Sequence, residues 1–291
     1  LPASRRPNPA AEGLGTSGPP FGGPGRGDVE VRQLGAMAPT QRVVLAIVGF
    51  IGGVLAASVL AGLVVSATGW ELSVPASIGS ELGRTVRQVG QAAPLDDHRV
   101  PAAWLAVVNA PLWLGLAGAP LLARRAGLSW RRDLGWGMSA IDIPAGLALG
   151  VATQFVLIPL YEVIFLFFGE QDVSGPARSL VASVDSPLDL LGLLVITVVM
   201  APLTEEIAYR GLLFGGIRDM ERGHVGSGVI IAAVVSSVIF AASHFQLIQF
   251  PGLFVFGLVA VAAFHRTGRL ATAIWAHVGF NLTTVVLLLW A

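Results

Sequence analysis

The sequence predicts an all-α fold, a polytopic bundle of about seven transmembrane helices. Of its 291 residues, 54% are hydrophobic and only 12% are charged, whereas about 25% are charged in soluble domains. Apolar stretches recur from residue 40 to the C-terminus, and several reach the roughly 20 residues that a helix needs to cross a bilayer. The composition and the length of these stretches together indicate an integral membrane protein.

Seven apolar stretches are the predicted spans. We expect each to be helical, because a segment inside lipid has to satisfy its own backbone hydrogen bonds. The predicted ranges are 43–68, 101–123, 143–168, 187–212, 227–246, 249–264 and 270–290. Together they predict one transmembrane domain over residues 40–291.

The segments outside these spans have a different character. Residues 1–39 are rich in proline and glycine and lack hydrophobic periodicity, which predicts a disordered N-terminal tail. Residues 70–100 follow the first span, and the string SELGRTVRQVGQ within them predicts a short amphipathic helix in an external loop.

Arginine predicts the orientation of the chain, since lysine is absent and arginine supplies all 18 basic residues. Arginines gather in the tail and in the loops after the second, fourth and sixth predicted spans, which share one side if there are seven spans. Basic loops favour the cytoplasmic side of a membrane. We therefore predict a cytoplasmic N-terminus and an external C-terminus.

Composition also excludes several classes of function. Without cysteine the chain can form no disulfide, thiolate zinc site or cysteine nucleophile, and without lysine it can form no lysine Schiff base. The formal net charge is zero, so no overall basic character points to nucleic acid. Neither a GxSxG elbow nor a Ser-His-Asp pattern is visible.

Polar side chains interrupt three of the C-terminal spans, in the strings TEEIAYRG, FAASH and HVGFN. A charge at the bilayer centre costs about 2.5–3.5 kcal/mol on insertion scales, so such groups usually face a protein interior or an aqueous cavity and mark a function. We predict that they converge in one polar pocket within the membrane. The residues concerned are Glu205, Glu206, Arg210, His244, His277 and Asn281.

Helical spacing gives the two glutamates different surroundings. Glu206 and Arg210 are four residues apart, so they share a face and can form an ion pair. Glu205 points about 100° away from Glu206, which leaves it free to act as a general base towards water. We expect Pro202 to kink the helix just before this pair. The alternative is that both glutamates are only ion-pair partners at a helix end.

The other two strings also place functional groups four residues apart. Phe240 and His244 would form one face with a ring wall that we predict to contact a substrate. His277 and Asn281 repeat the spacing; a neutral imidazole can orient water or bind a metal, and an amide can donate to an oxyanion. Each histidine alone is more often a packing residue. The three strings together supply the groups that hydrolysis of a peptide bond requires.

The cofactor is left open between two mechanisms. One needs no metal and uses a glutamate to activate water. The other uses Glu205, His244 and His277, with Glu206 as a substitute carboxylate, as a zinc-binding set. The short-range zinc signature HExxH is missing, so we favour the mechanism without a cofactor. Elsewhere, we predict that Gln154 forms a hydrogen bond between helices.

The three strings in this order, EExxxR followed by glycine, FxxxH and HxxxN, resemble the CPBP family of membrane peptidases. This family comprises the CAAX-protease and bacteriocin-processing (Abi) proteins, and the resemblance covers roughly residues 187–285. It implies an intramembrane endopeptidase with a four-helix catalytic core over about 187–290. Its implied substrates are prenylated CAAX-like or other membrane-associated peptides, and its implied location here is a bacterial cytoplasmic membrane.

The resemblance also implies a role for each matching residue. Glu205 would activate the attacking water, with assistance from His244. His277 and Asn281 would line the site, Asn281 stabilising the oxyanion. Glu206 and Arg210 would support the helix that carries Glu205.

Two other functions remain as alternatives at this point. One is a non-catalytic immunity or scaffold protein of the same fold. The other is a proton-coupled transporter, which predicts discontinuous helices in repeat-related pairs; we find one expected kink and no repeat. The predicted partners are membrane lipid and a peptide or lipidated peptide, without nucleic acid, and the sequence gives no prediction of oligomeric state.

Overall fold

The computed structural model of the chain describes residues 37–68, 102–182, 184–221 and 227–290. Most of the predicted tail and the whole predicted amphipathic helix around residues 80–91 lie outside these residues. Within them every regular element is a helix and none is a strand, which confirms the all-α prediction.

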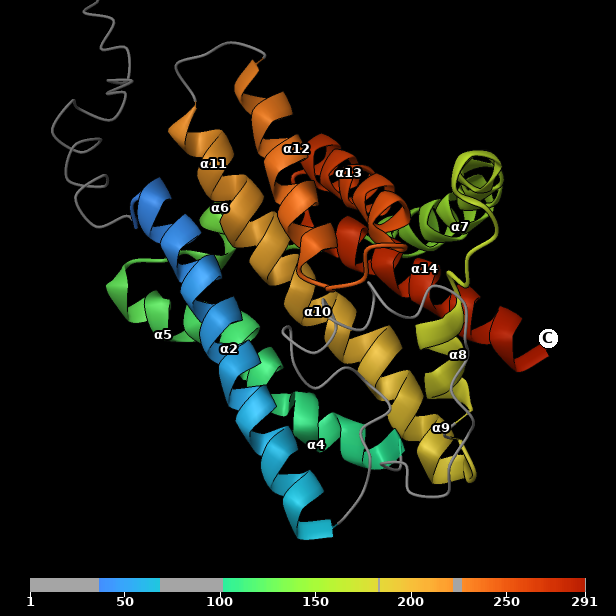
Figure 1. Cartoon of the computed structure of the whole chain (residues 1–291). Coiled ribbons are helices and arrows are strands. Elements are labelled where there is room, and N and C mark those ends of the chain that lie inside the picture. The colour runs from blue at the N-terminus through green and yellow to red at the C-terminus, as the bar shows by residue number, and fades with distance from the viewer. Residues whose placement is uncertain (1–36, 69–101, 183, 222–226, 291) are drawn as a thin grey trace, which may run out of the picture. The chain divides into compact units, whose positions relative to one another are not determined.

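Each predicted span corresponds to a helix or to a run of joined helices (Figure 1). Six runs are long and apolar enough to cross a membrane, counted over the described part of the chain. They and the shorter α12 are α2 (Pro39–Thr68), α4 (Ala102–Trp113) continued by η1 (Leu114–Gly118) and α5 (Ala119–Ala123), α7 (Asp142–Phe168), the composite helix Pro187–Met220, α12 (Ser227–Ala242), α13 (Phe250–Thr267) and α14 (Leu270–Trp290).

The fifth span is shorter than predicted, because α12 has 16 residues and ends at Ala242 rather than near residue 246. The chain then turns, with Phe245 in the left-handed region at φ 54°. Side chains other than glycine rarely adopt this conformation, and a helix cannot continue through it. His244 therefore lies in the turn after α12 and not within the helix.

The composite helix runs for 34 residues and changes its hydrogen-bonding pattern along the way. Its five parts are α9 (Pro187–Leu194), the π-helical η3 (Val195–Met200), α10 (Ala201–Glu206), the π-helical η4 (Ile207–Phe214) and α11 (Gly215–Met220). Pro202 stands near the start of α10, directly after the first π-helical part. Turns of π-helix inside longer helices are frequent at functional sites, and here two of them flank the short helix that carries both glutamates.

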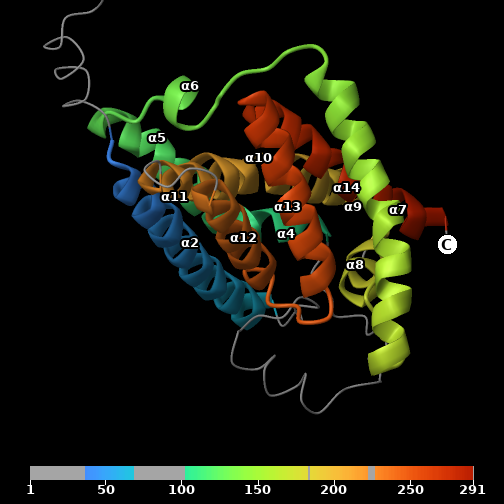
Figure 2. The same ribbon diagram turned by 90° about the horizontal axis from the view of Figure 1, so that it is seen from above.

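Helix α7 packs along α14 through direct backbone contact (Figure 2). A Cβ atom added at Gly150 would stand 2.0 Å from the carbonyl oxygen of Ala276, so glycine is required at this crossing. Further along, the Gln154 side-chain amide donates to the Phe280 carbonyl at 3.1 Å and also contacts the Thr284 hydroxyl. These bonds confirm the predicted role of Gln154 between helices.

Helix α2 packs against η1, η4 and α11 on another side of the composite helix. Near its start, the Arg42 guanidinium donates to the Asp219 carboxylate at 2.5 Å and to the Asp133 carbonyl at 3.1 Å. The bonds tie α2 to α11 and to the short helix α6 (Trp130–Asp133). Arg42, which lies near the predicted cytoplasmic N-terminus, is thus a buried arginine that joins helices.

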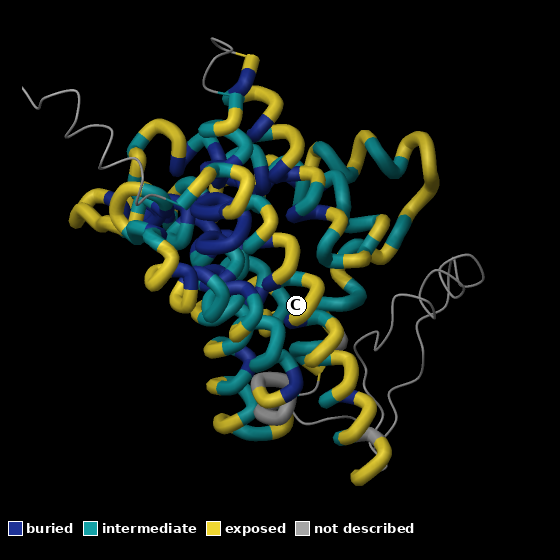
Figure 3. Tube along the Cα trace, turned by 90° about the vertical axis from the view of Figure 1, so that its left-hand side faces the viewer, coloured by how far each residue is buried: buried dark blue, intermediate teal, exposed yellow. Residues whose placement is uncertain are grey.

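Buried positions gather inside the helical bundle and exposed positions line its outside (Figure 3), and the helices differ in their share of buried positions. In α2 and α7 only 11% of the apolar window is buried, against 39% in α13 and α14. All eight residues of η4 are buried. The outward faces of α2 and α7 therefore have the apolar, exposed character that lipid contact requires, while the core lies around η4, α13 and α14.

Candidate active site

Glu206, Arg210 and His277 form a buried cluster between the composite helix and α14. Arg210 Nη1 and His277 Nδ1 each lie 2.9 Å from the same oxygen, Oε1 of Glu206. The three side chains are 0%, 1% and 4% exposed, in that order of residue number. An ionised carboxylate only accepts hydrogen bonds, so in the neutral imidazole Nδ1 of His277 carries the proton and Nε2 is an acceptor. The predicted ion pair is present and has a third member.

Aromatic rings and a carbonyl complete the surroundings of Arg210. Its guanidinium carbon lies 4.4 Å from the ring centroid of Phe240, within the range of a cation–π interaction. Its Nη2 donates to the carbonyl of Gly257 at 3.4 Å. The charge of Arg210 is thus offset by Glu206 and by oriented polar and aromatic groups, as a buried charge requires.

Glu205 and His244 face each other at the end of α12. Nε2 of His244 lies 3.9 Å from Oε2 of Glu205, and the side chains are 28% and 16% exposed respectively. Oε2 itself is buried and has no hydrogen-bond partner among the described residues. The structure thus brings together the two groups to which the family resemblance assigns water activation.

The hydrogen bond on the other ring nitrogen fixes the tautomer of His244. Nδ1 lies 2.8 Å from the carbonyl oxygen of Phe240, which can only accept. In the neutral imidazole Nε2 is therefore an acceptor directed at Glu205. An ionised carboxylate and this nitrogen cannot bond to each other, but at 3.9 Å they can accept the two hydrogens of one water molecule between them.

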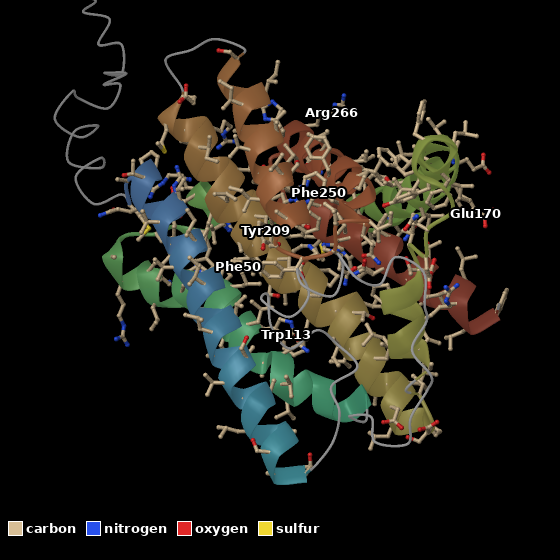
Figure 4. The ribbon with its side chains drawn as sticks, viewed as in Figure 1. Phe50, Trp113, Glu170, Tyr209, Phe250 and Arg266 are labelled. Atoms are coloured by element: carbon tan, nitrogen blue, oxygen red, sulfur yellow. The ribbon has the colours of Figure 1, made fainter. Side chains whose placement is uncertain are left out.

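A short hydrogen-bond chain that was not predicted from the sequence supports the Phe240 carbonyl. The last carbonyls of a helix lack partners within it, and this one accepts both from His244 and from Ser243 Oγ at 2.7 Å. Tyr209 donates to the same Ser243 hydroxyl at 2.7 Å. Figure 4 shows Tyr209 on the composite helix, well away from Glu170 beyond α7. Only the serine directly before His244 could have suggested such a chain.

Phe240 lies at the centre of the aromatic packing and is fully buried. Its ring centroid is 4.9 Å from that of His244 and 5.8 Å from that of His277. A ring with no exposed surface offers none to a substrate in this conformation. Phe240 instead packs against both histidines, and its contact with a substrate stays a prediction.

Asn281 does not face the histidines through a hydrogen bond; its Nδ2 donates to the carbonyl oxygen of Thr197 in η3 at 2.7 Å. Asn281 and His277 thus reach different parts of the composite helix from one face of α14. The structure divides the six polar residues into three groups rather than one shared cluster. They are the cluster of Glu206, Arg210 and His277, the facing pair of Glu205 and His244, and Asn281 with its bond to Thr197.

The predicted zinc-binding set is divided between these contacts. Glu205 and His244 face each other, whereas His277 directs Nδ1 at Glu206. Across residues 37–68, 102–182, 184–221 and 227–290, no three His, Asp or Glu side chains are grouped so that they could hold a metal ion. The choice between the two mechanisms stays a prediction.

Comparison with known proteins identifies the segment that contains this site. Residues 187–283, which hold all six polar residues, match the family model described as "Type II CAAX prenyl endopeptidase Rce1-like". The chain is 30% identical over 138 residues to the membrane-embedded CAAX protease MroQ of Staphylococcus aureus (strain USA300). That match covers 45% of this chain and 54% of the relative, so the chain spans about half the length of this curated relative. No solved structure matches the chain.

Proposed function

This chain belongs to the CPBP family of CAAX-protease-like membrane peptidases, and from that premise we propose that it is an intramembrane endopeptidase. The substrate class that we propose is a membrane-associated peptide, with prenylated CAAX-like peptides first among the candidates. We place the protein in a bacterial cytoplasmic membrane with its N-terminus in the cytoplasm, following the distribution of arginine.

Water activation by Glu205 is the central step of the proposal. A water between Glu205 and Nε2 of His244 would donate one hydrogen to each. As its oxygen attacks the scissile carbonyl carbon, the carboxylate takes the proton and the peptide carbonyl becomes the oxyanion of a tetrahedral intermediate. The same proton then passes to the leaving amine as the carbon–nitrogen bond breaks. The step consumes one water and needs no other reactant, and we propose it without a metal.

Glu206 has a different role in this proposal. With Arg210 and His277 on one oxygen, it holds the composite helix against α14 and keeps its own charge offset. Oε2 of Glu206 also lacks a hydrogen-bond partner among the described residues. The Glu206 side chain is 0% exposed, however, whereas that of Glu205 is 16% exposed, so we assign the base to Glu205.

One observation carries the proposal: Nε2 of His244, an acceptor in the neutral imidazole, lies 3.9 Å from Oε2 of Glu205, a buried oxygen without a hydrogen-bond partner among the described residues. In a packed protein almost every buried polar atom is satisfied, so an exception calls for a functional explanation. A reacting water satisfies both groups at once.

The test is cleavage of fluorogenic peptides by the purified protein in liposomes, with a farnesylated CAAX-like peptide and its unprenylated counterpart. Glu205→Gln preserves shape and removes the base, so turnover should fall about 10²–10⁴-fold while the unfolding temperature stays near that of the wild type. Glu205→Gln protein that cleaves as fast as the wild type would exclude this glutamate as the base.

Two further measurements address the alternatives. Activity is compared before and after chelation, with the metal content of the same sample; activity that falls on chelation and returns with stoichiometric zinc would overturn the metal-free step. Folded wild-type protein that cleaves none of the peptides would favour an immunity or scaffold role. Proton flux into liposomes that depends on Glu205 would favour a transporter.

A further inference from the structure

The helix around Pro202 leaves one carbonyl without a donor from its own backbone. In a π-helix each N–H bonds to the carbonyl five residues earlier, and the Ala201 N–H does so with Ile196. The next carbonyl, that of Thr197, would take the N–H of residue 202. Proline has none, so the backbone ladder is interrupted at Thr197.

Asn281 supplies the missing donor. Its Nδ2 lies 2.7 Å from the Thr197 carbonyl oxygen, a short and direct amide hydrogen bond from a different helix. This bond is partly buried, and a carbonyl without a partner in a membrane-spanning helix is costly because lipid offers no hydrogen-bond donor. The side chain of Asn281 therefore completes a ladder that the sequence itself breaks.

The bond also matters for the position of Glu205. Helix α10 has only six residues, lies between two π-helical parts, and carries Glu205 and Glu206 at its end. Asn281 donates to the Thr197 carbonyl, four residues before α10 begins. His277, one turn earlier on α14, bonds to Glu206, the last residue of α10. Two side chains of one helix thus hold α10 from both ends.

The backbone of α14 is held in turn by α7. The Gln154 amide donates to the carbonyl of Phe280, the residue directly before Asn281. Gly150 allows backbone contact one turn away, at Ala276. The position of Asn281 is therefore supported by the packing of α14 against α7.

We propose that Asn281 is a positioning residue, which replaces the backbone donor that Pro202 lacks and thereby sets the place of Glu205 relative to His244. The proposal rests on the proposed function for its effect on turnover, but not for its effect on the helix. It differs from the oxyanion role that the family resemblance implies, in which the amide of Asn281 acts on the substrate.

A double-mutant cycle separates the two roles. Pro202→Ala restores a backbone N–H at the interrupted position, so the Thr197 carbonyl gains a donor that does not depend on Asn281. Asn281→Ala should lower turnover at least about tenfold in the wild-type background, the effect of leaving a partly buried acceptor unsatisfied. In the Pro202→Ala background it should lower turnover less than about threefold. An equal loss in both backgrounds would overturn the proposal and favour the oxyanion role.

Amide hydrogen exchange gives a readout that needs no activity. Asn281→Ala should accelerate exchange at residues 203–206 of α10, and the acceleration should shrink when Pro202→Ala is added. Thr283→Val is the matched control, since its hydroxyl donates to Gly279 within α14, and it should change neither turnover nor exchange in α10.

The exchange experiment remains decisive if Pro202→Ala does not fold or if the wild type cleaves no peptide. In either case the comparison of Asn281→Ala with the otherwise unmodified protein is sufficient: faster exchange in α10 supports the positioning role, and unchanged exchange overturns it. A protein without peptidase activity but with this acceleration would contradict the proposed function and leave the positioning role intact.

Discussion

Glu205 and Glu206 are neighbours in one short helix, yet the structure surrounds them with different groups. One oxygen of Glu206 lies 2.9 Å from nitrogens of both Arg210 and His277, and the Glu206 side chain is fully buried. Glu205 has a single charged or titratable neighbour within ion-pair range among the described residues, His244 at 3.9 Å, and its side chain is 16% exposed. One carboxylate is held by its contacts, and the other is left able to act on a third molecule.

The difference shows how a membrane protein can keep two carboxylates at low dielectric. A buried charge is tolerated when a partner offsets it, and the offset charge then serves to join helices. A carboxylate without such a partner is costly, which is justified where it performs chemistry. Consecutive positions on a helix point in different directions, so one dipeptide can provide both a carboxylate that joins helices and a carboxylate that performs chemistry.

Removal of Arg210 should have the largest effect on this comparison, because it leaves Glu206 buried without its cation. Breaking one side of a buried ion pair costs about 3–5 kcal/mol, so we expect Arg210→Met to yield little folded protein. The measurement is thermal unfolding in detergent. The matched control is Arg178→Met, which breaks an ion pair with Asp172 whose side chains are 57% and 50% exposed; exposed pairs contribute about 0–1 kcal/mol. Equal unfolding temperatures for the two variants would refute the structural role of Arg210.

The sequence predicts one side of this comparison better than the other. The ion pair of Glu206 and Arg210 follows from spacing within one helix, and the membrane helices follow from apolar length. The partner of His277 does not follow, because the choice between Glu205 and Glu206 depends on how α14 crosses the composite helix. A buried membrane helix is apolar on all sides, so its sequence periodicity does not encode which face meets which neighbour.

Two further features were beyond prediction for local reasons. The end of α12 at Ala242 depends on the left-handed conformation of Phe245, which no glycine or proline marks in the sequence. The bond from Asn281 to Thr197 depends on a π-helical register, and the sequence indicated only that Pro202 would disturb the helix. The spacing HxxxN correctly places His277 and Asn281 on one face of α14, but it does not specify what each one binds.

Helix α7 lies outside the residues that match the family model. A substitution where it crosses α14 tests whether α7 positions the cluster of Glu206, Arg210 and His277. Gly150→Ala puts a Cβ atom 2.0 Å from the Ala276 carbonyl oxygen, next to His277. We expect a loss of about 1–3 kcal/mol in unfolding free energy, the usual cost of overpacking. The structural displacement should be smaller in the turn that holds His244 than at this crossing. Gly62→Ala is the control, since nothing lies within 4 Å of its added Cβ, and alanine there should be neutral or stabilise α2 by up to about 1 kcal/mol. Similar unfolding temperatures for both variants would show that α7 does not set the position of α14.

The smallest predicted effect concerns the support of His244. Tyr209→Phe removes one hydroxyl that donates to Ser243, while Ser243 and His244 keep their bonds to the Phe240 carbonyl. A neutral hydrogen bond of this kind is worth about 0.5–1.5 kcal/mol, so we expect kcat to fall about two- to tenfold. KM should stay unchanged, since Tyr209 is buried and its hydroxyl supports the pair of Glu205 and His244 rather than contacting the substrate.

The other tyrosine of the chain provides the control for that prediction. Tyr161 carries a hydroxyl that bonds to the backbone at Ile248, Gln249 and Gly252, and not to the turn residues 243–244. Tyr161→Phe should therefore lower the unfolding temperature slightly without a selective loss of kcat. If both variants lose kcat to the same extent, the Tyr209 hydroxyl has no special connection to His244. If only Tyr209→Phe loses kcat, the two glutamates also differ in what supports their partners. The partner of Glu205, His244, then depends on a hydrogen-bond chain, whereas Glu206 depends on an ion pair.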